Sequence, residues 1–164
     1  MLDQAGPDQD WPDEAAAGAD AGRWFIDLVR VETRLYNAVE NRLKAELGLT
    51  AGQFQMMRII ADVPNCRVLD LVRETAITVG AASKAVDRIE AAGWCRRDSN
   101  PHDRRSSYLT LTPDGERVLA AAAPVFTAEV TGLLAAASDD ALAQSGATLA
   151  RLRRALEADH RTAQ

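Results

Sequence analysis

The sequence predicts a mainly α-helical domain with one small antiparallel β-hairpin after its middle. Apolar residues recur every three or four positions over most of the chain. Glycine and proline interrupt this pattern at regular points, and residues 94–111 combine extended segments with a turn-rich centre. With 164 residues, of which 47% are apolar and 26% charged, the chain is long enough for one hydrophobic core of ordinary size.

Several kinds of protein are disfavoured by composition. No run approaches eighteen uninterrupted apolar residues, and the N-terminus lacks a basic region followed by an apolar one, so we expect a cytoplasmic protein without a membrane span or signal peptide. Cys66 and Cys95 are too few for a disulfide framework, and two histidines provide no metal-ligand spacing. We therefore expect reduced structural thiols, no metal and no cofactor.

The N-terminal residues 1–20 contain six acids, two prolines and two glycines, which predicts a disordered acidic tail. The helical pattern begins at Ala21 and continues to Leu47, where Gly48 ends it. A helix of this length usually buries only part of its apolar surface on its own domain. Some of that surface is therefore expected to belong to a partner subunit.

Two shorter helices come next. Thr50 has the hydroxyl of an N-cap for a helix over Ala51–Asp62, which Pro64–Asn65 ends. Leucine and valine spacing then predicts a short helix over Val68–Thr75.

A third helix is predicted over Val79–Ala92, with Thr78 as its N-cap. Its apolar stripe follows the spacing i, i+3, i+4, i+7 and consists of Ala82, Ala85, Val86 and Ile89. Its opposite face has small residues at the N-terminal end. Such a face allows a helix backbone to approach the floor of a major groove about 12 Å wide, although a helix buried in an unrelated bundle would favour small residues too.

The hairpin follows Gly93, which suits the left-handed position after a helix. We expect strands at Trp94–Arg97 and Ser107–Leu111, joined by a turn-rich tip at 98–105, with Leu109 and Leu111 facing the same side. Two short helices with a tight connection, followed by a hairpin, form a winged helix-turn-helix, which here spans residues 50–112.

The C-terminal part is again helical. Thr112, Pro113 and two acids predict a helix start. That helix is expected to reach about Ala137 with a kink at Pro124. A last helix begins at 138–140 and runs to about 158, which leaves 159–164 as a short tail.

Charge is unevenly distributed along the chain. The net charge of −5 argues against a nucleic-acid partner when the chain is taken as a whole. Residues 67–108, however, hold eight lysines and arginines against six acids. The acidity therefore lies outside the predicted winged helix.

The run from Asp70 to Gly115 resembles the MarR family of bacterial transcription regulators, most specifically in the pattern D-R-R-S-x-x-L-x-L-T-x-x-G that begins at Asp103. The resemblance covers residues 21–158. It implies a homodimer held by helices at 21–48 and 113–158, which places two winged lobes on a palindromic double-stranded DNA operator. The implied function is a sequence-specific transcriptional regulator, a repressor released by a small aromatic or phenolic effector.

The resemblance and the chemistry of the side chains together predict the DNA-binding residues. By position in the family pattern, Arg105 resembles the arginine that enters the minor groove, Arg104 resembles a second groove or phosphate contact, and Asp103 resembles the residue that stabilises the wing. On the helix, small and polar side chains suit base edges, and cations suit phosphate. These residues are Thr78, Val79, Gly80, Ala81, Ser83, Lys84 and Arg88. For Arg88 the alternative is an ion pair with neighbouring Asp87 or Glu90.

The signal that controls binding is less well defined. The chain lacks the early cysteine of peroxide-sensing relatives and the histidine and carboxylate cluster of zinc-binding ones. An aromatic effector pocket is one interpretation of five apolar residues that also suit a plain core or a dimer interface: Trp24, Phe25, Tyr36, Phe54 and Met57.

Two other classes of function are weighed against DNA binding. A winged helix can serve as a protein-interaction module without specific DNA binding, but such a module has no need for adjacent arginines at its tip. An enzyme is not expected, because the sequence has no glycine-rich phosphate loop, nucleophile elbow or His-Cys or His-Ser constellation.

Overall fold

The first helix forms over the predicted residues and crosses between two units of the chain. The computed structural model describes residues 20–101, 103 and 105–162. All of the predicted acidic tail except Asp20 lies outside these residues. Contacts within the chain define one unit up to Arg34 and a second unit from Leu35 onward, and helix α1 (Ala21–Leu47) belongs to both. Gly48 follows it with φ of +63°, as expected for a glycine after a helix.

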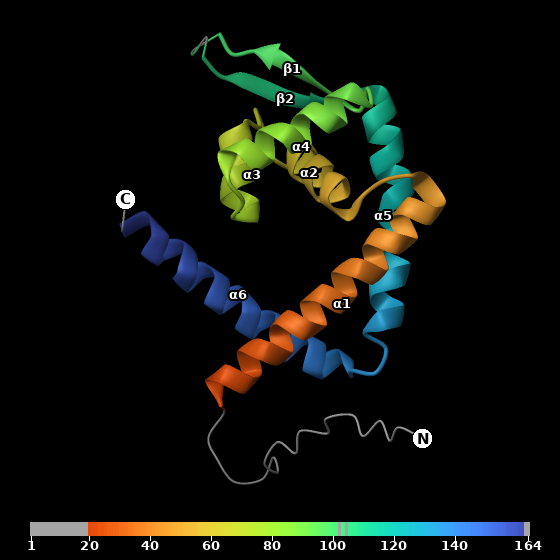
Figure 1. Cartoon of the computed structure of the whole chain (residues 1–164), viewed down its shortest axis with the longest axis vertical. Helices are drawn as coiled ribbons and strands as arrows, with labels where there is room; N and C mark the ends of the chain where they lie inside the picture. Colours follow the sequence, from red (N-terminus) through yellow and green to blue (C-terminus); the bar gives the residue numbers. More distant parts are fainter. Residues whose placement is uncertain (1–19, 102, 104, 163–164) are drawn as a thin grey trace, which may run out of the picture. The chain divides into compact units, whose positions relative to one another are not determined.

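Three helices and a hairpin form the centre of the second unit (Figure 1). Helix α2 (Ala51–Asp62) begins with a capping box, in which Thr50 Oγ1 accepts from Gln53 N and Gln53 Oε1 accepts from Thr50 N. Helix α3 (Val68–Thr75) and helix α4 (Val79–Ala91) follow with the predicted starts. Ala76 joins α3 to α4 in the left-handed region, at φ of +56°.

Strands β1 (Cys95–Ser99) and β2 (Ser107–Leu111) pair antiparallel and form the predicted wing. Strand β1 begins one residue later than predicted and continues two residues further, because Asp98 and Ser99 pair with Tyr108 and Ser107. The hairpin is anchored on one side by a backbone hydrogen bond from Leu109 N to Cys66 O, at 2.7 Å. This bond ties the segment before α3 to β2.

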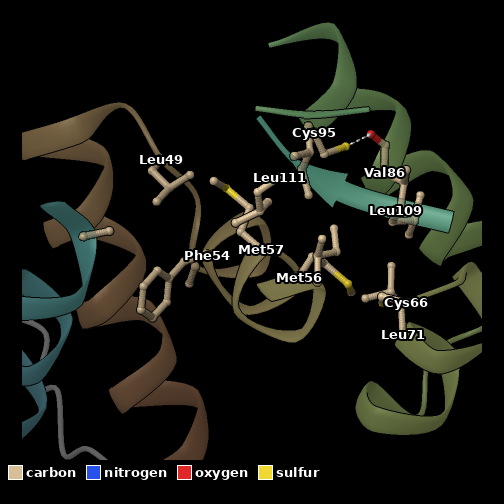
Figure 2. Packing of buried hydrophobic residues seen from close by; sticks show 14 of the residues in the cluster. Leu49, Phe54, Met56, Met57, Cys66, Leu71, Val86, Cys95, Leu109 and Leu111 are labelled. Atoms are coloured by element: carbon tan, nitrogen blue, oxygen red, sulfur yellow. Dashed lines mark hydrogen bonds between the residues drawn. The ribbon is translucent and has the colours of Figure 1, made fainter. Parts of the chain in front are cut away.

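The hydrophobic core lies where the hairpin packs on the helices (Figure 2). Helix α4 contributes its predicted stripe, in which Ala82, Val86 and Ile89 are fully buried. The hairpin contributes Leu109 and Leu111, both buried, so the predicted inward face of β2 is confirmed. Helix α2 supplies the largest share of the remaining core: Ala51, Phe54, Met56, Met57 and Ile60.

Helix α5 (Pro113–Leu133) begins at the predicted cap, where Thr112 Oγ1 accepts from Gly115 N. It continues through Pro124 but ends before the predicted Ala137. Gly132 lies near this end, and a glycine lowers helix stability relative to alanine; the chain then turns through hydrogen bonds from Ala135 N to Gly132 O and from Ala137 N to Leu134 O.

Helix α6 (Asp139–Thr162) extends beyond the predicted end of the domain at 158, so residues 159–162 are not a separate tail. Ser138 Oγ accepts from Ala141 N near the start of this helix. The apolar residues of α6 are largely uncovered in the single chain, and Leu149, Leu152 and Leu156 are all exposed. Among the described residues, no helix is long and apolar enough to cross a membrane.

The close contact between Gly115 and Trp94 generates a stability prediction. A Cβ atom added at Gly115 would lie 1.9 Å from the backbone oxygen of Trp94. This distance is too short for two non-bonded atoms, so the backbone would have to move. Gly115→Ala should therefore lower the free energy of unfolding by about 1–3 kcal/mol, as overpacking does. Urea denaturation would measure the change.

Gly132→Ala is the matched control, because it lies on the same helix and a Cβ there meets nothing within 4 Å. It should leave stability unchanged or raise it by up to about 1 kcal/mol, through helix propensity. Equal effects of the two substitutions would contradict the assigned contact.

Candidate nucleic-acid interface

Helix α4 buries one side and presents the other to solvent. Thr78 caps it by accepting a hydrogen bond from Ala81 N to Oγ1, at 3.2 Å. The first turn after this cap is exposed, and 51% of the Val79 surface is accessible. A Cβ built on Gly80 meets nothing within 4 Å, so the backbone is open to close approach there.

The predicted helix contacts lie on this open side with one partial exception. Ser83 is half-buried. The others are exposed: Thr78, Val79, Gly80, Ala81, Lys84 and Arg88. The arrangement can present small side chains and two cations to one ligand surface.

The wing tip is held by hydrogen bonds around Asp103. Its Oδ1 accepts from Arg105 N at 3.0 Å, and its backbone oxygen accepts from Ser106 N at 3.1 Å. Asn100 is buried beneath this loop and donates from Nδ2 to Ser106 Oγ at 2.8 Å. Arg105 is exposed. The predicted second tip contact, Arg104, lies outside the described residues.

Ion pairing separates the cations of the region into two groups. Arg96 and Arg97 of β1 are paired with acids, and hydrogen bonds with those acids raise the pKa of both guanidinium groups. Over the described part of the chain, Lys84, Arg88 and Arg105 form no ion pair. These three unpaired cations are among the predicted DNA contacts, and no carboxylate of the described residues pairs with them.

The alternative for Arg88, an ion pair with Asp87 or Glu90, is not formed. Both acids instead contact Arg97, which reaches them from the hairpin. Sequence reasoning missed this role of Arg97, and it also missed Asn100 beneath the wing tip. For Arg97 the sequence held one indication. Arg96 and Arg97 occupy adjacent positions on a strand, so their side chains point to opposite faces and only one of them can face α4.

The five residues of the predicted effector pocket have different surroundings. Phe54 and Met57 belong to the hydrophobic core, and the Phe54 ring packs on Phe126 with centroids 4.9 Å apart. Trp24, Phe25 and Tyr36 are exposed in the single chain. The structure thus assigns two of the five to the core, which was the alternative interpretation, and the pocket itself stays a prediction.

Both thiols are buried among apolar side chains. Burial raises the pKa of Cys66 from 9.0 to about 11, and it has the same effect on Cys95. Cys95 Sγ lies 4.0 Å from Val86 O. Figure 2 marks this contact with a dashed line. At neutral pH these thiols are protonated and inaccessible, as expected of structural cysteines.

Comparison with known sequences identifies residues 49–107 as a match to the MarR family. The transcriptional regulator HosA of Escherichia coli O111:H- is 36% identical over 77 residues, which are 47% of this chain and 57% of that protein. The chain therefore spans less than two thirds of the length of that relative. The family match at residues 49–107 contains α2, α3, α4 and β1, and it ends at the first residue of β2.

Solved structures show the same fold. A MarR family transcriptional regulator from Streptomyces coelicolor, determined in complex with DNA, aligns with a TM-score of 0.76 at 23% identity, covering 86% of this chain and 94% of that chain. BpsR of Bordetella bronchiseptica, described with regulation of its DNA binding by 6-hydroxynicotinic acid, aligns with a TM-score of 0.72 at 22% identity. That alignment covers 79% of this chain and 98% of BpsR.

The thiol environment predicts slow chemical modification. In the native protein at pH 7–8, Cys66 and Cys95 should react with a thiol reagent at a small fraction of the rate seen in urea, because a pKa of about 11 leaves little thiolate. The raised pKa values also contribute stability that is present below pH 9 and is lost as pH rises toward 11. Rapid stoichiometric labelling of the folded protein would contradict this environment.

Proposed function

We propose that this chain, which belongs to the MarR family, binds double-stranded DNA in a sequence-specific manner and regulates transcription. The observation that supports this most directly is the exposed face of α4, where Lys84 and Arg88 are unpaired beside small side chains. Similarity to HosA over 77 residues and the family match at residues 49–107 support the same conclusion. As a regulator of the chromosome, the protein is proposed to work in the cytoplasm.

The proposed mechanism divides recognition between the helix and the wing. Helix α4 enters the major groove, where Ser83 and Lys84 reach base edges or phosphate and Arg88 contacts phosphate. Arg105, at the wing tip, enters the minor groove, where negative potential is concentrated. Asp103 fixes the loop by accepting the hydrogen bond from Arg105 N. Arg104 is proposed as a second tip contact from its position in the sequence.

The functional unit is proposed to be a homodimer on a palindromic operator. Support comes from apolar surface that the single chain leaves uncovered on α6, at Leu149, Leu152 and Leu156, and on α1, at Trp24 and Phe25. Two recognition helices must lie about 34 Å apart to enter successive major grooves. The helices at 21–48 and 113–158 are proposed to set this spacing.

The protein is proposed to act as a repressor while it is bound to its operator. An effector is proposed to change the spacing of the two recognition helices and so to release the DNA. Regulation of BpsR by 6-hydroxynicotinic acid supports an aromatic acid as the class of ligand. Trp24, Phe25 and Tyr36 remain candidates for contacting it because they are exposed. Phe54 and Met57 would act only through the core in which they are buried.

A protein-interaction module is the alternative within the same fold. The observation against it is that the exposed cations on α4 and at the wing tip are unpaired, whereas Arg96 and Arg97 in between are paired. Salt dependence distinguishes the two functions, because neutralisation of phosphates releases counterions and makes DNA binding fall steeply with salt concentration.

Arg105→Ala should weaken operator binding by about 1–3 kcal/mol and leave the oligomeric state unchanged. Fluorescence anisotropy at several salt concentrations would measure it, on a duplex selected from genomic fragments. Arg153→Ala is a matched control, since it removes the same charge from an exposed, paired arginine on α6. Absence of salt-dependent DNA binding by the unmodified protein would exclude the proposed function. Unchanged affinity in Arg105→Ala would show that the wing tip does not contribute to DNA binding.

Leu152→Glu should shift the protein from dimer to monomer, because it places a charge within the uncovered apolar stripe of α6. Sedimentation equilibrium measures the mass directly. Arg153→Glu, at the adjacent position, is the control for added negative charge and should remain dimeric. A monomeric unmodified protein at micromolar concentration would contradict the dimer.

A further inference from the structure

We propose that Arg97 is a positioning residue for DNA binding, acting through Asp87 and Glu90, whose negative charge it neutralises so that α4 can approach phosphate. This inference rests on the proposed function. It assigns Arg97 no contact with DNA. It explains instead how a recognition helix with two acids beside its cations can bind a polyanion.

The guanidinium group of Arg97 in β1 contacts two carboxylates of the preceding helix, α4. Arg97 lies in β1, opposite Leu109 of β2, and its Nη2 atom is 2.6 Å from Asp87 Oδ1. Its Nη1 atom bonds to Glu90 Oε2 as well. Asp87 and Glu90 are three residues apart on α4, so their carboxylates lie next to each other on the helix surface. A forked guanidinium can satisfy both at once.

Asp87 lies where its negative charge would repel the phosphates of bound DNA. Residues 80, 84 and 87 follow the spacing i, i+4, i+7, which places Asp87 on the same face as Gly80 and Lys84. Its side chain is 61% exposed even with the ion pair formed. An unpaired carboxylate there would lie within the screening length, about 8–10 Å, of any phosphate that Lys84 contacts.

The ion pair is a weak candidate for a folding role. The side chains of Asp87, Glu90 and Arg97 are 61%, 36% and 30% exposed, so the ion pairs are partly solvated. Ion pairs that water reaches in this way usually contribute little to stability. The hairpin is already held by its buried face and by the bond from Leu109 N to Cys66 O. The main consequence of losing Arg97 is therefore expected in DNA binding.

Arg96 provides a matched comparison on the same strand. Its Nε atom is 2.9 Å from Asp98 Oδ1, and Thr110 Oγ1 donates to the other oxygen of that carboxylate, also at 2.9 Å. These three residues belong to the hairpin alone. Arg96 and Arg97 thus carry the same charge at adjacent positions, but only Arg97 reaches α4.

The test measures affinity for one selected duplex by fluorescence anisotropy. Arg97→Ala should weaken binding by about five- to tenfold, because two carboxylates are left uncompensated near phosphate. Arg96→Ala should stay within about twofold of the unmodified protein. Adding Asp87→Asn and Glu90→Gln to Arg97→Ala should restore most of the lost affinity. The defect of Arg97→Ala should also shrink as salt rises, since screening weakens repulsion.

Other outcomes overturn the inference. Equal affinities of Arg97→Ala and Arg96→Ala would do so, and so would a triple variant as weak as Arg97→Ala. If Arg97→Ala does not fold by circular dichroism, the double variant Asp87→Asn/Glu90→Gln decides: it should bind at least as tightly as the unmodified protein, and weaker binding overturns the proposal. Failure of the folded, unmodified protein to bind any duplex overturns the proposed function itself, which is a distinct result.

Discussion

The wing depends on burial of its inner face. An isolated two-stranded hairpin is at best marginally stable in water. Here Cys95, Leu109 and Leu111 enter the core, and the bond from Leu109 N to Cys66 O adds a backbone anchor. Only with this face buried can the outer side of the hairpin and its tip present charged residues in a fixed place relative to α4.

Much of the fold could be predicted because its boundaries are encoded locally. Thr50, Thr78 and Thr112 each cap a helix through a side-chain hydrogen bond, and Gly48 and Gly93 follow helices at positive φ. The spacing of apolar residues on α4 likewise predicted which side of that helix is buried. Boundaries without a strong local feature were less accurate: α5 ends at Leu133 and α6 continues to Thr162.

The candidate site was only partly predictable, because its electrostatics depend on contacts between elements. The exposed small residues and cations of α4 follow from helix geometry alone. The partner of Asp87 does not, since a nearby arginine on the same helix, Arg88, is as plausible from sequence as Arg97 on β1. Likewise, the partner of Phe54 in the core, Phe126 of α5, lies far along the sequence and could not be identified from the spacing of residues on α2.

The junction at Gly115 gives the molecule a mechanical property. The start of α5 lies against the root of the hairpin, where Thr112 N donates to Trp94 O at 3.0 Å and Thr112 Oγ1 donates to Gly93 O at 2.6 Å. With no side chain at Gly115, helix and strand meet backbone to backbone without slack. The direction of the wing is therefore tied to the direction of α5, because the first turn of the helix and the base of the hairpin cannot move apart without breaking these contacts.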